Sequence, residues 1–88
     1  MNYSVLSSLV LLNVLFFNVQ CLRNKIDLIN AHVTTHNYEI LCFCEHWMSQ
    51  FEVESLLIND FEIADFYSRS KYKNGGTLLL VKKTYKLY

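Results

Sequence analysis

Two polar side chains follow short apolar runs, at positions where strands of a sheet would end. Asn18 follows residues 14–17, and Glu45 follows residues 39–44. Ligands of open α/β sheets bind outside the carboxyl ends of the strands. A carboxylate at Glu45 suits a hard cation, and the amide of Asn18 can orient a phosphate without adding charge. The alternatives are an ordinary solvated carboxylate at Glu45 and a simple turn residue at Asn18.

A basic segment precedes the adjacent glycines Gly75 and Gly76. Arg69, Lys71 and Lys73 alternate along it, with tyrosines interleaved. Glycine lets a backbone approach a phosphate closely, and the cations can neutralise phosphate charge. Such contacts position DNA without reading its sequence. A loop with three positive charges is also commonly just solvated, so both interpretations stand.

Two further groups resemble metal sites but lack the required ligands. His32 and His36 are four residues apart, yet no glutamate stands second in the motif and no third ligand is evident, so a solvated helix face is favoured. Cys42, Cys44 and His46 alternate, but zinc sites rarely use that spacing, and buried core thiols are favoured.

The elements that position these residues follow from the apolar periodicity. Apolar residues at intervals of four, three and four are Leu22, Ile26, Ile29 and Val33. This stripe predicts an amphipathic helix that ends near His36, because Asn37 tolerates the left-handed conformation of a helix end. The runs at residues 14–17 and 39–44 predict short buried strands on either side. Together they predict a βαβ unit with parallel strands.

The second half of the chain predicts a hairpin. Residues 49–57 indicate a short helical turn in which Phe51 starts a weak stripe. Residues 61–67 alternate and predict a strand with Phe61, Ile63 and Asp65 on one face. A turn at residues 74–76 precedes a strand at residues 77–81. The basic loop at residues 68–74 therefore joins two antiparallel strands.

Composition restricts the class of protein. A chain of 88 residues fits one domain. With 52% hydrophobic and 18% charged residues it is globular rather than disordered. The formal net charge of zero gives no general attraction to nucleic acid, so contact with DNA requires a local patch. An odd number of cysteines outside any disulfide framework favours reduced thiols and an intracellular protein.

The first residues form an apolar extension, residues 1–13, ahead of a domain at residues 14–88. Residues 5–17 have the length of a signal-peptide core, and residues 19–21 make a tolerable cleavage site, but no basic residue precedes the apolar run. A membrane span is disfavoured because Asn13, Asn18 and Gln20 interrupt it. Nuclear or cytoplasmic localisation is favoured over secretion, and no membrane contact is expected unless the extension is a signal.

Three segments, taken in order, carry a family resemblance. They are NVQCLRNK at residues 18–25, EHWM at residues 45–48 and GGTLLLV at residues 75–81. They resemble the endonuclease/exonuclease/phosphatase (DNase I-like) superfamily, and within it the apurinic-type endonuclease domains of non-LTR retrotransposons. The resemblance covers residues 14–84 and implies a partial α/β sandwich. It also implies Mg²⁺ held by Glu45, a catalytic role for Asn18, and DNA nicking by phosphodiester hydrolysis. Gln20 replaces an acidic residue of the apurinic-site repair enzymes, so the first strand's contribution stays open.

The family's chemistry also needs residues beyond Val81, including a terminal Asp-His pair that supplies the general base. This chain has no histidine after His46. We therefore expect a truncated domain at residues 14–88 that is inactive alone, binds DNA weakly or not at all, uses no small-molecule cofactor, and associates through an exposed apolar sheet edge. The alternative is a small secreted or membrane-associated interaction protein with residues 1–21 as a cleaved signal peptide.

Overall fold

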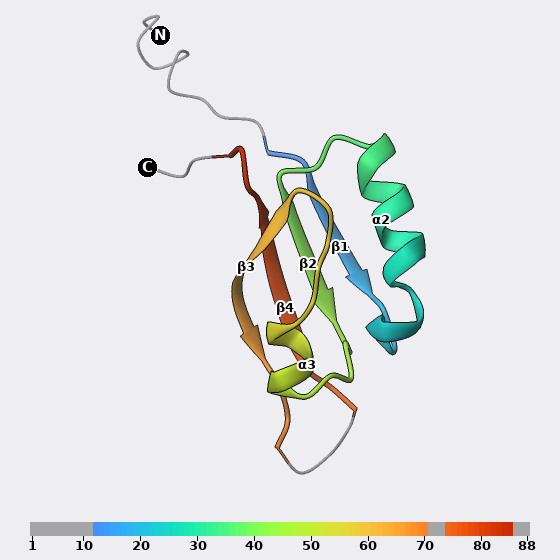
Figure 1. The fold of residues 1–88 in the computed structure, drawn as a ribbon, viewed down its shortest axis with the longest axis vertical. Coiled ribbons are helices and arrows are strands. Elements are labelled where there is room, and N and C mark those ends of the chain that lie inside the picture. The colour runs from blue at the N-terminus through green and yellow to red at the C-terminus, as the bar shows by residue number, and fades with distance from the viewer. Residues whose placement is uncertain (1–11, 71–73, 86–88) are drawn as a thin grey trace, which may run out of the picture.

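A four-stranded mixed sheet organises the residues that this computed structural model describes, 12–70 and 74–85 (Figure 1). The strands are β1 (Val14–Asn18), β2 (Ile40–Cys44), β3 (Phe61–Tyr67) and β4 (Thr77–Lys82), and their order in the sheet is β1-β2-β4-β3. The helices are the 3₁₀ turn η1 (Leu22–Asn24), α2 (Ile26–Thr35) and α3 (Gln50–Glu54). The fold class is therefore mixed α/β, as the sequence predicts.

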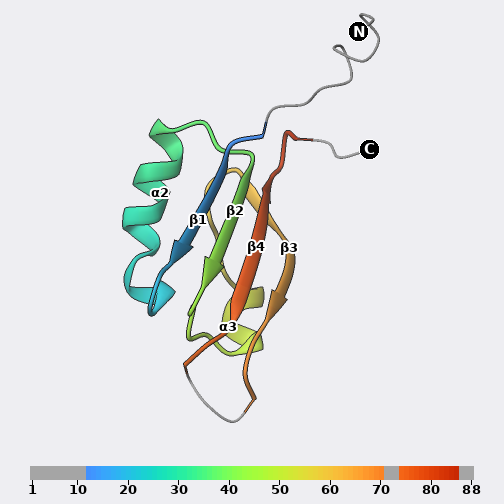
Figure 2. The same cartoon turned by 180° about the vertical axis from the view of Figure 1, so that it is seen from behind.

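The βαβ unit and the hairpin are both confirmed. The predicted burial of the first strand is wrong, because every residue of β1 except the half-buried Leu15 is exposed. β1 and β2 are parallel neighbours, with Asn18 opposite Cys44. β3 and β4 pair antiparallel, and β4 also pairs antiparallel with β2 (Figure 2). The hairpin thus inserts its second strand into the middle of the sheet. No helix in the described residues is long and apolar enough to cross a membrane.

The helices cover one face of the sheet and build the core there. The central strands contribute Leu41, Phe43, Leu78 and Leu80. Across from them lie the helical residues Leu22, Ile29, Val33 and Val53. The predicted stripe is therefore correct, although Ile26 is only half-buried. Burial of one helix face against an apolar sheet is the main force holding α2 in place.

The predicted single helix is divided in two and ends differently from expectation. Lys25 leaves helical geometry at φ −124° and separates η1 from α2. After Thr35 the chain is extended at His36, so no left-handed residue stops the helix. The Thr35 hydroxyl and the His36 ring instead occupy the carbonyl of His32 at 3.0 and 2.9 Å. At the end of α2, side chains therefore satisfy the free His32 carbonyl, which a left-handed backbone turn would otherwise do.

The apolar contact of α3 was predicted at the wrong residue. Val53 is fully buried, whereas Phe51 is 78% exposed. A capping box fixes the helix start, because the Ser49 hydroxyl accepts from the Glu52 amide and Glu52 accepts from the Ser49 amide. That start turns Val53 toward the sheet. The Ser-x-x-Glu spacing was a visible signal for it.

A bulge in β3 overturns the predicted face of Asp65. The pairing with β4 shifts between Ile63 and Asp65. Phe66 consequently lies opposite Leu78 and packs on the core, while Asp65 is exposed. One extra residue in a strand reverses the alternation beyond it, so simple period-two counting fails there.

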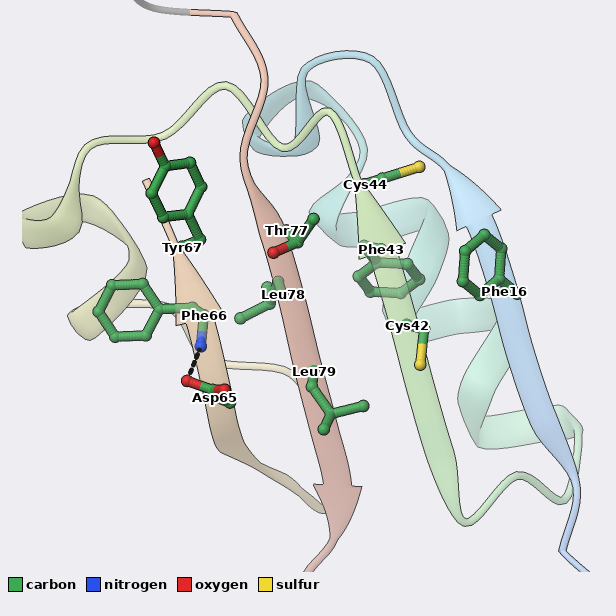
Figure 3. A pocket seen from close by; sticks show the side chains of 10 residues that line it. All are labelled: Phe16, Cys42, Phe43, Cys44, Asp65, Phe66, Tyr67, Thr77, Leu78 and Leu79. Atoms are coloured by element: carbon green, nitrogen blue, oxygen red, sulfur yellow. Dashed lines mark hydrogen bonds between the residues drawn. The ribbon is translucent and has the colours of Figure 1, made fainter. Parts of the chain in front are cut away.

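The second face of the sheet has no covering element among the described residues (Figure 2). Figure 3 shows side chains on this face. The face carries a shallow hollow of about 270 Å³. Phe16, Cys42 and Leu79 are among the residues that line it. Cys42 and Cys44 are half-buried on this face, so the expectation of core thiols was wrong. All three cysteines of the chain are free.

Candidate functional site

The two predicted site residues lie at one end of the sheet. Asn18 is the last residue of β1, and Glu45 directly follows the last residue of β2, which stands opposite Asn18. Parallel neighbouring strands are about 4.8 Å apart, so these residues leave the sheet side by side. Asn18 is exposed and Glu45 is half-buried. The predicted placement at neighbouring strand ends is correct.

The loop between β3 and β4 reaches the same end. Thr77 begins β4 opposite Cys44, so the preceding glycines adjoin Glu45. The Glu45 amide donates to the Gly76 carbonyl at 2.8 Å, and the Trp47 amide donates to the Gly75 carbonyl at 3.0 Å. The glycine pair therefore forms one wall beside Glu45.

The segment leading into η1 forms the opposite wall. The Cys21 amide donates to the Glu45 carbonyl, and the Leu22 amide donates to the His46 carbonyl, both at 3.0 Å. Glu45 has φ +60° and Trp47 has φ +58°, a left-handed conformation that costs energy for residues with side chains. Hydrogen bonds on both sides hold the backbone of residues 45–47, with Glu45 and Trp47 in this conformation.

His46 is a buried structural residue and does not act as a metal ligand. Its side chain is fully buried. Nδ1 accepts from the Met48 amide at 2.8 Å, so Nε2 carries the proton and donates to the Tyr67 carbonyl at 2.8 Å. The ring lies where a Cβ at Gly76 would stand, and Gly76 has φ +93°. Sequence reasoning grouped His46 with Cys42 and Cys44 and missed this role.

Arg23 joins three elements near the site. Its Nε and Nη2 donate to Glu52 Oε2 of α3 at 2.9 and 2.6 Å, and Nη2 also donates to the Trp47 carbonyl at 3.0 Å. The hydrogen bond to Glu52 raises the pKa of the Arg23 guanidinium. The same bond, followed by the one from the Ser49 amide, lowers the pKa of the Glu52 carboxyl. The sequence showed Arg23 only as part of a motif.

The oxygen donors fit Mg²⁺ in part. Within residues 12–70 and 74–85, no three histidine, cysteine, aspartate or glutamate side chains gather to hold a metal. In that part of the chain, the side chains of Asn18 and Glu45 make no hydrogen bond. Mg²⁺ keeps several waters and is commonly held by one or two carboxylates plus substrate phosphates. Glu45 and Asn18 therefore supply one carboxylate and one amide, and waters and phosphate oxygens would have to complete the coordination of Mg²⁺.

Two buried polar atoms near this end of the sheet have no hydrogen-bond partner among the described residues. They are Trp47 Nε1 and Ser68 Oγ. Trp47 lies beside Gly75, and Ser68 follows the last residue of β3. Buried polar atoms normally find partners, so a further oxygen near them would be stabilised.

The structure describes only the ends of the predicted basic loop. Arg69 is exposed, and its aliphatic part packs against Gly75. Lys71 and Lys73 lie outside the described residues. The described ends of the loop, Arg69 and Asn74, adjoin Tyr67 and Thr77 at the end of the sheet that carries Glu45.

His32 in α2 and His36, which follows that helix, lie far from this site. The His32 and His36 rings stack with centroids 4.0 Å apart, and His32 Nε2 pairs with the Tyr38 hydroxyl at 3.0 Å. His32 is half-buried rather than solvated. Residue 36 leads toward the first residue of β2, so the pair occupies the opposite end of the sheet.

Comparison of the chain with family models, curated proteins and solved structures finds no match. The end of the sheet around Glu45 is therefore the basis for assigning a function.

Proposed function

We propose that the chain is the N-terminal part of a Mg²⁺-dependent DNA endonuclease domain of the endonuclease/exonuclease/phosphatase type, similar to those of non-LTR retrotransposons. In this proposal residues 14–88 hold part of a metal and phosphate site without turnover on their own. The observation that carries the proposal is the convergence of Asn18, Glu45 and the Gly75–Gly76 loop at one end of the sheet.

Each residue has a role that its chemistry allows. Glu45 would hold Mg²⁺, which when bound supplies positive charge at the scissile phosphate. The Asn18 amide would donate to a phosphate oxygen. Arg69, Lys71 and Lys73 would contact the DNA backbone. These contacts position DNA, and they select no sequence.

We expect no turnover because no histidine of the chain can serve as a general base near Glu45. A general base must reach the water that it activates. His46 is fully buried with both ring nitrogens engaged, and His32 and His36 lie at the opposite end of the sheet. The chain has three histidines, so none of them can act as the base near Glu45. Plasmid nicking should therefore stay at background in Mg²⁺.

The alternative, a secreted interaction protein, requires that residues 1–21 be cleaved off as a signal peptide. Cleavage after Cys21 would remove β1, the site residue Asn18 and the buried Val19. It would also remove the Val19 and Cys21 amides that bond to Cys44 and Glu45. The close integration of residues 14–21 into the sheet therefore supports the nuclease-type proposal.

A binding experiment tests the proposal. Fluorescence anisotropy of a labelled DNA duplex would be measured in Mg²⁺ and in EDTA at low salt, because phosphate contacts weaken as salt rises. We expect weak binding with a Mg²⁺-dependent component that Glu45→Gln removes and a salt-sensitive component that Arg69→Gln reduces. Glu62→Gln and Lys83→Gln are matched controls, since they make the same charge changes at the other end of the sheet.

Two results would overturn the proposal. One is equal binding in Mg²⁺ and EDTA. The other is an effect of Glu62→Gln as large as that of Glu45→Gln, because a general charge effect would then explain the binding.

A further inference from the structure

Three consecutive residues donate hydrogen bonds to the backbone carbonyls of residues 45–47. The carbonyls of Glu45, His46 and Trp47 accept in turn from the Cys21 amide, the Leu22 amide and the Arg23 side chain. The first two bonds join backbone groups and survive any side-chain change. The third depends on one guanidinium, and the residue it holds, Trp47, is left-handed at φ +58°.

Arg23 is itself fixed in position. Two of its nitrogens bond to one carboxylate oxygen of Glu52, and Glu52 is held by the capping box at the start of α3. The guanidinium thus bridges η1, the segment after β2 and α3. A planar, forked donor can satisfy a carboxylate and a carbonyl together, whereas an ammonium on a flexible stem does so poorly.

We propose that Arg23 is a positioning residue for Glu45. With Glu52 it holds the backbone of residues 45–47, which is left-handed at Glu45 and Trp47, and so aims the Glu45 carboxylate at the metal. This inference rests on the proposed function. Arg23 touches neither metal nor DNA in this role, and it acts through the Trp47 carbonyl. Partners that orient a metal ligand typically change metal affinity roughly 10- to 100-fold when they are removed.

The test reads backbone geometry and metal binding separately. Positive φ at Glu45 and Trp47 gives a strong amide to α-proton NOE within each residue. In Arg23→Gln we expect that NOE to weaken at Trp47 and Glu45, and Mn²⁺, used as the probe, to bind roughly tenfold more weakly. Arg23→Lys should not restore either signal, and Glu52→Gln should weaken both partly. Lys83→Gln, which removes a positive charge far from the site, should change neither.

The outcomes separate the two proposals. Wild-type protein that binds no Mn²⁺ near Glu45 overturns the proposed function. Wild-type protein that binds Mn²⁺ there, with the same affinity and the same NOE in folded Arg23→Gln and Arg23→Lys, overturns the positioning role alone. If Arg23→Gln does not fold, Arg23→Lys and Glu52→Gln decide the question through the same two signals.

Discussion

The ion pair between Arg23 and Glu52 is largely exposed, so its energy is small. The side chains are 44% and 39% exposed, and exposed pairs contribute about 0.2–1 kcal/mol. The left-handed conformation at Trp47 costs about 1–2 kcal/mol relative to a right-handed one. A hydrogen bond from a charged group to the Trp47 carbonyl is worth about 1.5–3 kcal/mol. The cost of the left-handed conformation and the gain from the Arg23 hydrogen bond are similar in size. The conformation of Trp47 should therefore be sensitive to the loss of the Arg23 side chain.

The coupling between Arg23 and Glu52 should weaken at low pH. The Glu52 pKa is lowered from its ordinary value of 4.5 in the folded protein, first by the bond from Arg23. Its contribution to the free energy of unfolding is therefore complete above that value and is lost as pH falls through the lowered one. A double-mutant cycle with Arg23→Gln and Glu52→Gln, followed by urea unfolding, should give about 0.2–1 kcal/mol of coupling at pH 7. A coupling that grows on acidification would contradict the assignment.

At the element scale, the glycine loop is shaped by the buried His46 ring. Gly75 and Gly76 both have positive φ, at +89° and +93°. A Cβ at position 76 would collide with the His46 ring, whereas one at position 75 would meet the flexible Arg69 side chain. The two positions share the backbone strain and differ in what the new methyl group meets.

Alanine substitutions separate these two effects. Gly76→Ala should lower the free energy of unfolding by about 2 kcal/mol or more, because strain and a collision with a fixed ring add. Gly75→Ala should lower it by about 1 kcal/mol, from strain alone. Urea unfolding of the two variants measures the difference. An equal or larger loss for Gly75→Ala would show that the His46 ring does not confine the loop.

The sequence predicts elements well where one physical signal dominates. The apolar runs before Asn18 and Glu45 predicted strands correctly because short β-branched and aromatic runs favour extended backbone. They wrongly predicted that β1 is buried, because one face of the sheet is open. The bulge in β3 escaped prediction because it depends on pairing with β4, and the buried role of His46 depends on contacts with Met48 and Tyr67. At the site, neighbouring strand ends follow from a βαβ unit. The Arg23 bridge requires the packing of α3, which periodicity does not reveal.

Within the described residues, the sheet has an open face and an open edge at β1, and we expect self-association through them. β1 is an edge strand without a charged residue, and its Phe16 is 74% exposed. The other edge, β3, carries Glu62, Asp65 and a bulge, devices that discourage pairing. Charge and irregular geometry therefore protect one edge and leave the other exposed.

Sedimentation of two matched variants tests this asymmetry. Phe16→Lys should reduce concentration-dependent association, because lysine on an edge strand disfavours pairing. Phe51→Lys removes an equally exposed phenylalanine from α3, 78% exposed against 74%, and should leave association largely unchanged. An equal effect of both variants would indicate general apolar adhesion instead of contact through β1.

We propose a metal and phosphate site where Asn18 and Glu45 leave the sheet. Paramagnetic broadening of backbone amide NMR signals by Mn²⁺ tests it most directly, because broadening falls steeply with distance from the ion. We predict that the amides of Asn18, Glu45 and Gly76 broaden first, that Glu45→Gln abolishes this pattern, and that Glu62→Gln preserves it. Broadening that centres on Asp60 or Glu62, or that is unchanged by Glu45→Gln, would contradict the claim.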